Sequence, residues 1–371
     1  MKISLSTAEL VRQIQTASRV ASTRSAIQAL AGVRIDAVDA TVEMLATDME
    51  VGLRLRLDAE LQRPGTVVLP ARLLLDVARA LSGPQVSLEL RDAEHDVEIV
   101  SGPTTFHLRT LRTDDFPPLP NVGGEADSVV SVPAQAFVDT IAKVARSASR
   151  DETRPILTGI LVSASGSELR MVATDSYRLS VKETRLEVPL TQPFEANVPA
   201  RALQELARIA TAVGAETLSV APRQNQIVFE LEGVVLSSRL IDGQFPNYRQ
   251  LLPDTSEHEL RVAREELTDV VRRISLLAQK NAPVRLAFTP GELTVSARTP
   301  DVGEASEALP IPFQGESFDI GFNPEFLRDG LESVESDDLI LKLTSPLRPG
   351  LIESADDSGF VYLVMPIRLN V

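Results

Sequence analysis

Apolar and polar positions alternate with two different periods along the first third of the chain. Residues 7–18 and 70–81 place apolar side chains on one face of a helix, with Ser6 or Thr7 as the first cap. Residues 53–57 alternate leucine with arginine, which is the period of a half-buried strand. The other expected strands are 33–38, 41–46, 66–69, 86–90, 97–100 and 105–111. Two helices with about eight antiparallel strands predict an α+β fold, with the helices packed on antiparallel sheets.

The same pattern occurs again further along the chain. The matching segments are 44–48 with 171–175, 70–72 with 199–201, 111–117 with 240–246, and the Thr-Arg pairs 23–24 with 153–154. A fainter third copy includes 323–327. Ordered repetition of this kind indicates repeated structural units. We therefore predict three domains of one fold, at residues 1–121, 129–249 and 250–371, joined by segments rich in proline, glycine and acidic residues.

The charges are distributed unevenly between the predicted helices and the rest of the chain. The 371 residues have a formal charge of −15, which by itself argues against a nucleic-acid partner. The five predicted helices at 7–19, 70–82, 135–150, 199–211 and 265–280 nevertheless hold 12 basic and 7 acidic residues. The sixth helix, near 324–335, is acidic. Cationic helix faces on an acidic protein indicate a surface for a polyanion, contacted through its phosphates without reading sequence.

Motifs for catalysis, cofactors or metals are not found in the sequence. It has no cysteine and three histidines, and neither a nucleotide-binding glycine loop nor a zinc-protease motif occurs. We predict no cofactor and no metal. Asp48 and Asp175, each in an Ala-Thr-Asp segment, leave open an enzyme with an acidic site, although the pattern favours a repeated turn at the end of a strand. No signal-peptide core or 20-residue apolar run occurs, so we expect a cytoplasmic protein without a membrane partner.

Three segments identify a family. Residues 173–179 (ATDSYRL), 241–249 (IDGQFPNYR) and 362–369 (YLVMPIRL) resemble the bacterial sliding clamp, the β subunit of the DNA polymerase III holoenzyme, and the likeness covers the whole chain. The resemblance implies a head-to-tail homodimeric ring whose helices line a central hole around double-stranded DNA. It also implies a non-catalytic processivity factor. The implied partners are the polymerase III alpha subunit, the clamp loader, and other polymerases and repair proteins that carry short clamp-binding peptides.

The DNA contacts are assigned to basic residues of the helices and neighbouring loops. The helix pattern and the resemblance together assign them to Arg24, Arg72, Arg79, Lys143, Arg146, Arg150, Arg154, Arg201, Arg208 and Arg273. By resemblance, Arg24 lies in a loop of the first domain, and Arg150 and Arg154 in the corresponding loop of the second. Pro155 and Ile156 follow Arg154 where the family often has aromatic residues, which indicates altered loop contacts.

Two further sites follow from the resemblance. The dimer interface would join Phe106 and Leu108 to Ile274, Leu276 and Leu277, although each could equally be a core residue of its own domain. The peptide-binding cleft would comprise Leu157, Thr174, Ser176, Tyr177, Arg178, Leu179, Pro246, Gln250, Leu251, Leu347, Pro349, Leu363, Met365, Pro366, Ile367, Arg368 and Leu369. This set suits an apolar groove for a peptide with Gln, Leu and Phe anchors, with Arg178 and Arg368 as polar edges.

The chain departs from the family pattern near the cleft. Ser176-Tyr177 replaces a Gly-His pair, Gln250 stands where a basic residue is common, and Asn370-Val371 follow the usual terminal leucine. The sequence also leaves open whether the chain is the replicative clamp or a paralogue. Two rival functions remain at this stage, a peptide-binding scaffold that does not bind DNA and an enzyme acting at Asp48 or Asp175.

Overall fold

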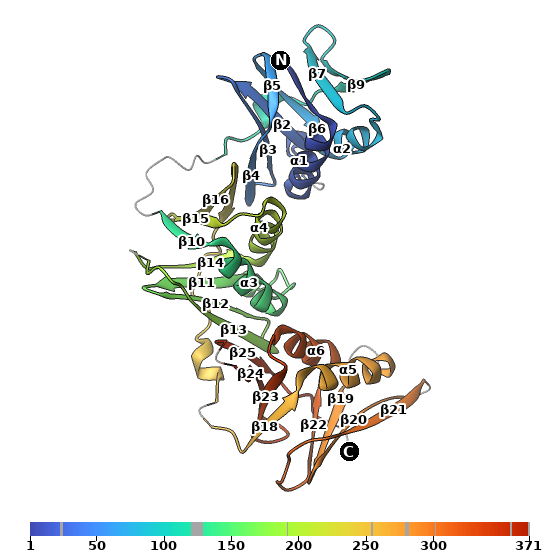
Figure 1. The fold of residues 1–371 in the computed structure, drawn as a ribbon, viewed down its shortest axis with the longest axis vertical. Coiled ribbons are helices and arrows are strands. Elements are labelled where there is room, and N and C mark those ends of the chain that lie inside the picture. The colour runs from blue at the N-terminus through green and yellow to red at the C-terminus, as the bar shows by residue number, and fades with distance from the viewer. Residues whose placement is uncertain are drawn as a thin grey trace. The chain divides into compact units, whose positions relative to one another are not determined.

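The chain forms two compact units that are each built on antiparallel sheets (Figure 1). The computed structural model describes residues 1–22, 25–119, 129–190, 192–253, 255–278, 282–300, 302–356 and 358–369. Unit 1 contains Met1–Gln135 and Arg208–Leu240, and unit 2 contains Ala136–Ala207 and Ile241–Val371. The middle repeat thus contributes strands to both units, because part of it extends the sheet of the first repeat and part extends that of the third.

Unit 1 contains two sheets and the helices α1 and α2. The five-stranded sheet has the order β5 (Ala59–Arg63), β1 (Lys2–Ser6), β7 (Gln85–Arg91), β8 (Asp96–Ser101) and β9 (Thr104–Arg109). The eight-stranded sheet has the order β10 (Val130–Pro133), β15 (Thr217–Pro222), β16 (Gln226–Leu231), β17 (Val234–Arg239), β4 (Val51–Arg56), β3 (Thr41–Thr47), β2 (Gly32–Val38) and β6 (Gly65–Pro70). The pairing of β17 with β4 joins strands of two repeats.

Helices α1 (Thr7–Val20) and α2 (Ala71–Ala80) pack side by side (Figure 1). The Ser6 hydroxyl accepts a hydrogen bond from the Glu9 amide, so Ser6 is the cap of α1. Leu10 and Ile14, on the predicted apolar face, are completely buried. The packing confirms the helical period that predicted both elements.

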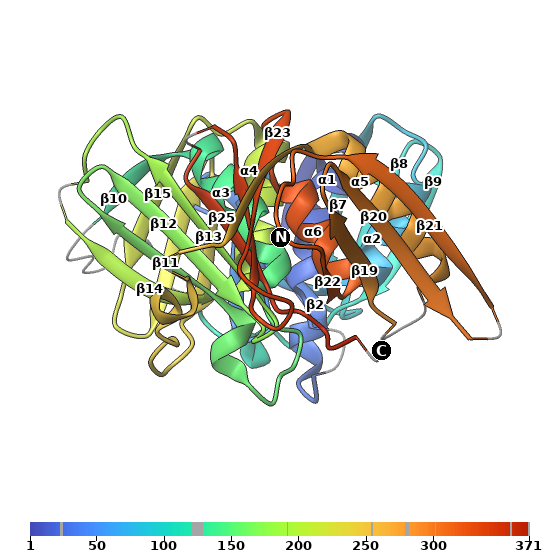
Figure 2. The same cartoon turned by 90° about the horizontal axis from the view of Figure 1, so that it is seen from below.

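Unit 2 also contains an eight-stranded sheet and a smaller one. The first has the order β14 (Phe194–Pro199), β11 (Gly159–Ser165), β12 (Glu168–Thr174), β13 (Arg178–Arg185), β25 (Phe360–Val364), β24 (Gly350–Ser354), β23 (Asp338–Leu343) and β18 (His258–Ala263). The four-stranded sheet has the order β21 (Gly303–Pro310), β20 (Glu292–Thr299), β19 (Val284–Thr289) and β22 (Phe318–Phe322). Helices α5 (Arg264–Ile274) and α6 (Pro324–Ser333) lie against one another (Figure 2).

The structure confirms the α+β fold and corrects several predicted elements. Strands β1 and β5 were not expected, and β5 is short and has no fully buried residue. Helix α3 (Ala134–Val144) ends well before the predicted residue 150, and a short 3-10 helix follows at Ala145–Ser147. Arg150 therefore lies beyond the helix. Helices α4 (Ala200–Val213) and α6 lie close to their predicted positions, and α5 ends at Ile274.

Candidate functional site

A tight turn joins β12 to β13 at the centre of the predicted peptide site. The Asp175 carboxylate accepts hydrogen bonds from the amides of Tyr177 and Arg178, at 2.9 and 3.0 Å. The Thr174 hydroxyl donates to the carbonyl oxygen of Arg178 at 2.7 Å and accepts from the Ser176 amide. Ser176 adopts a φ of 80°, in the left-handed region that the turn requires.

The first repeat forms the same turn between β3 and β4. The Asp48 carboxylate accepts hydrogen bonds from the amides of Glu50 and Val51. The Thr47 hydroxyl, like that of Thr174, donates to the carbonyl oxygen four residues on, that of Val51, and accepts from the amide two residues on, that of Met49. Met49 has a φ of 81°. The repeated Ala-Thr-Asp segment is thus a structural turn in which the aspartate caps backbone amides. This geometry explains both aspartates without an acidic active site.

Strand pairing brings the predicted peptide-site residues of two repeats together. Leu179 of β13 pairs with Leu363 of β25, and the Met365 amide donates to the carbonyl oxygen of Tyr177 at 2.8 Å. Beneath them lies a buried apolar cluster of Val172, Leu179, Val181, Phe245, Tyr248, Leu351 and Leu363. The large hydrophobic side chains left exposed among the predicted residues are Tyr177, Leu251, Leu347 and Met365. Exposed apolar side chains over a buried core suit the binding of an apolar peptide.

The remaining predicted peptide-site residues have various surroundings. Pro246, Gln250 and Arg368 are exposed, Pro349, Pro366, Ile367 and Leu369 are half-buried, and Leu157 and Thr174 are buried. The Ile367 amide donates to the carbonyl oxygen of Gly321 at 2.7 Å, which attaches this segment to β22. Asn370 and Val371 lie outside the described residues.

Arg178 was predicted to form a polar edge of the peptide-binding cleft, but it is buried below the surface. It is only 7% exposed, and its guanidinium pairs with Asp175 at 3.0 Å and with Asp329 at 2.6 Å. Burial opposes the charge, but Tyr362 and the two carboxylates outweigh it and raise the pKa of Arg178. The Arg178 side chain is therefore part of the buried support of the site and not of its exposed surface.

Phe326 and Asp329 belong to this site and were not predicted. The Arg178 guanidinium carbon lies 4.3 Å from the centre of the Phe326 ring, and the Tyr177 ring stacks on Phe326 with 6.5 Å between centres. Both new residues are in α6, whose first turn is capped by Asn323. The segment 323–327 was noted only as a faint repeat copy, so the sequence indicated its place but not its role.

Three of the predicted DNA-contacting cations are paired with carboxylates that are distant in the chain. Lys143 lies 2.7 Å from Glu335, Arg146 lies 2.8 Å from Glu332, and Arg273 lies 2.6 Å from Glu307. Glu332 of α6, and Glu335 just after the helix, thus neutralise part of the positive charge at the C-terminal end of α3. A phosphate that approaches Lys143 or Arg146 must compete with these carboxylates.

The other predicted cations differ in how available they are. Arg79 donates to Gln15, and Arg154 pairs with Asp151 and also donates to the Ser176 hydroxyl. Arg72 and Arg150 are exposed and make no ion pair within the described ranges. Arg201 is exposed and Arg208 is half-buried, while Arg24 lies outside the described residues.

The predicted interface residues divide into buried and accessible members. Leu108 in β9 and Ile274 at the end of α5 are core residues of their own units. Phe106 and Leu277 are half-buried, and Leu276 is 83% exposed. Strand β9 forms an edge of its sheet. Leu276 and Phe106 are therefore the members most able to contact a second chain.

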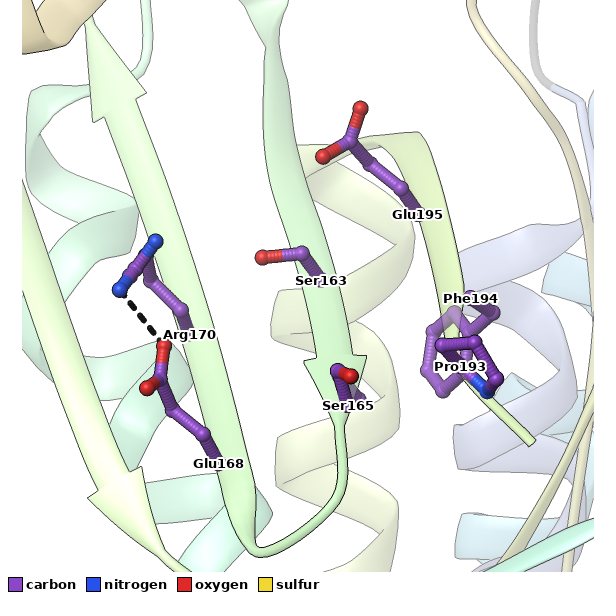
Figure 3. A pocket seen from close by; sticks show the side chains of 8 residues that line it. Ser163, Ser165, Glu168, Arg170, Pro193, Phe194 and Glu195 are labelled. Atoms are coloured by element: carbon purple, nitrogen blue, oxygen red, sulfur yellow. Dashed lines mark ion pairs between the residues drawn. The ribbon is translucent and has the colours of Figure 1, made fainter. Parts of the chain in front are cut away.

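A shallow pocket of about 340 Å³ lies on β11, β12 and β14 (Figure 3). Its lining comprises Ser163, Ala164, Ser165, Glu168, Arg170, Pro193, Phe194 and Glu195. The Arg170 guanidinium pairs with Glu168 at 2.6 Å and with Glu183 at 2.7 Å. Neither serine of this lining is hydrogen-bonded to one of its carboxylates, so the pocket shows no activated nucleophile.

Two features are absent from the described part of the chain. It contains no group of three or more acidic or histidine side chains that could hold a metal ion. None of its helices combines the length and apolar character needed to cross a membrane.

Known proteins resemble this chain over its whole length. Family models of the N-terminal, central and C-terminal domains of the DNA polymerase III beta subunit match residues 1–120, 131–247 and 249–368. The beta sliding clamp of Synechococcus elongatus is 33% identical, with 100% of both chains covered.

Solved structures give the same result. The crystal structure of the DNA polymerase sliding clamp from Bacillus subtilis matches with a TM-score of 0.92 and 29% identity, covering 100% of each chain. The sliding clamp from Pseudomonas aeruginosa, solved bound to griselimycin, matches with a TM-score of 0.91 and 26% identity, also covering 100% of each.

Proposed function

Because the chain belongs to the DNA polymerase III beta subunit family and functions as a sliding clamp, we propose that two copies close into a ring around duplex DNA. The observation that supports this most is the match of all three domain models, in order, along the chain. The predicted boundaries at 1–121, 129–249 and 250–371 are part of the proposal. A head-to-tail interface closes into a ring when its rotation is right.

In this proposal the clamp performs no chemistry. It keeps a polymerase near the primer end, so that a lost contact is remade at high effective concentration. The partners would be the polymerase III alpha subunit, the clamp loader, and other polymerases and repair proteins in the cytoplasm. Their short peptides would bind at the exposed Tyr177, Leu251, Leu347 and Met365, as griselimycin is a ligand of the Pseudomonas aeruginosa clamp.

The basic residues would guide DNA through the ring without reading its sequence. Contacts with phosphate oxygens are independent of sequence, and weak contacts allow sliding. Arg72 and Arg150, which have no ion pair within the described ranges, are the best placed for this role. Lys143, Arg146 and Arg273 would contribute less, because each already faces a carboxylate.

Retention on circular DNA tests the proposal. The chain is loaded onto nicked circular DNA by a bacterial clamp loader with ATP, isolated on the DNA, and the DNA is then cut. A ring stays on the circle and leaves after linearisation. Equal loss from both forms would refute encirclement, and peptide binding without retention would favour a scaffold that does not act on DNA.

The mass in solution gives an independent check. A closed dimer has about twice the 40.2 kDa of one chain. Sedimentation at low micromolar concentration should show this mass. A stable monomer would contradict the proposed ring and leave the peptide site to be tested separately.

A further inference from the structure

Helix α6 presents a carboxylate to cations from two different parts of unit 2. The Asp329 side chain, 15% exposed, accepts from Arg178 at 2.6 Å and lies 3.4 Å from the Arg146 guanidinium. Arg146 has a second and closer partner in Glu332, at 2.8 Å. Asp329 is therefore the main partner on α6 for Arg178, whereas Arg146 relies mainly on Glu332.

The buried Arg178 guanidinium depends on its carboxylates. A cation removed from water is destabilising unless its charge and its donors are matched. Asp175 matches the Nε donor and Asp329 matches Nη1. These two bonds keep the guanidinium over the Phe326 ring, at 4.3 Å from its centre.

The exposed Tyr177 ring, which forms part of the proposed peptide-binding surface, packs on this arrangement of Arg178 and Phe326. Tyr177 is 60% exposed, and its ring lies against Phe326 with an interplanar angle of 26°. Its backbone is fixed on one side by Asp175 and on the other by the Met365 amide. The position of the Tyr177 ring therefore depends on Phe326 and, through Phe326, on Arg178.

We propose that Asp329 is a positioning residue for peptide binding, which holds the Arg178 guanidinium against the Phe326 ring and so orders the Tyr177 ring before a peptide arrives. This inference rests on the proposed peptide-binding function. Asp329 itself does not contact the peptide. Its effect is to restrict the rotamers of the Tyr177 side chain in advance, so that less conformational entropy is lost when a peptide binds.

The test compares Asp329→Asn with Glu332→Gln in the full chain. Both variants remove one negative charge from α6, three residues apart, and both lose a partner of Arg146. Only the first removes a partner of Arg178. A fluorescein-labelled peptide carrying Gln, Leu and Phe is titrated, and its dissociation constant is read from fluorescence anisotropy.

We expect Asp329→Asn to raise the dissociation constant about tenfold, which corresponds to ~1.4 kcal/mol. Glu332→Gln should leave it within about twofold, a change below ~0.4 kcal/mol. Similar losses in both variants would overturn the proposal, since general charge or stability would then explain them. An unchanged constant in Asp329→Asn would overturn it as well.

A spectroscopic signature separates positioning from a loss of folding. The chain contains only three tyrosines, so 3-fluorotyrosine labelling gives three fluorine resonances, with that of Tyr177 assigned by Tyr177→Phe. Asp329→Asn should move the Tyr177 resonance and leave that of Tyr248 in place. An unmoved Tyr177 resonance refutes the role. No peptide binding by the unmodified chain would instead refute the proposed peptide site itself.

Discussion

Gly330 in α6 allows the helix to lie directly against β25. A Cβ atom at this position would be 2.5 Å from Cδ1 and 2.7 Å from Cε1 of Tyr362, and 3.0 Å from Cδ1 of Ile352. Both neighbours are almost completely buried and have no free space to enter. Burial raises the pKa of the Tyr362 phenol, which stays neutral and donates to the carbonyl oxygen of Phe326 at 2.8 Å.

Two effects of opposite sign decide what Gly330→Ala does. Replacing glycine by alanine inside a helix stabilises it by about 1 kcal/mol. Overpacking of a filled core destabilises by about 1–3 kcal/mol. Separating Tyr362 from Phe326 would lose a further ~1 kcal/mol of hydrogen bonding. We expect a net loss of about 1–3 kcal/mol, which for a unit of roughly 200 residues lowers the melting temperature by about 3–10 °C.

Calorimetry of Gly330→Ala, Tyr362→Leu and the double variant measures these terms. In the Tyr362→Leu background the ring no longer meets the new methyl group, so the alanine should cost less there. The two substitutions should therefore show a coupling of at least about 1 kcal/mol. A higher melting temperature for Gly330→Ala alone, as helix propensity by itself predicts, would refute the packing argument.

Three further predictions concern charge and assembly. Arg150→Gln should reduce the slope of log affinity for a short DNA duplex against log salt concentration by about 0.9. Arg146→Gln should reduce it by less than half of that, because two carboxylates already face Arg146. Equal slopes for the two variants would contradict the inference that Arg150 is more available to phosphates than Arg146. Arg91 holds the pKa of the Asp96 carboxyl below its usual range, so the pair contributes stability above the ordinary carboxyl pKa and loses it as pH falls through the lowered one. The free energy of unfolding of Asp96→Asn, measured in urea, should thus approach that of the unmodified chain below about pH 4, and a gap that stays constant on acidification would argue against the pairing. Leu276→Asp should weaken the dimer about 10²- to 10⁴-fold, since each of two interfaces would lose roughly 1.5–3 kcal/mol of apolar burial; unchanged sedimentation would place Leu276 outside the interface.

The repeated fold was predictable because its signals are local. Helical and strand periods appear within a dozen residues, and three similar copies reinforce one another. The turns at Asp48 and Asp175 were also predictable from the sequence, because threonine and aspartate side chains accept hydrogen bonds from backbone amides within three residues. The two missed strands, β1 and β5, are short, and β5 is largely exposed.

The length of α3 was not predictable from its pattern alone. The apolar and basic spacing continues to residue 150, but the helix ends at Val144. Ser147 is buried there, and its hydroxyl lies 2.6 Å from that of Ser180 in β13. A partner distant in the chain thus competes with the helical pattern and places Arg150 in a loop.

The residue pattern alone thus establishes three repeats of an α+β fold, an excess of cations over the first five predicted helices taken together, and the identity of the family. The tertiary structure decided which of those charges are available. Arg146 and Glu332 are 186 residues apart, and no local period relates them. In the same way, Arg178 was expected at a polar edge but lies buried between Asp175, Asp329 and Phe326. Periodicity reports which face of its own element a residue occupies, whereas ion pairs and ring stacking depend on which distant elements the fold brings into contact.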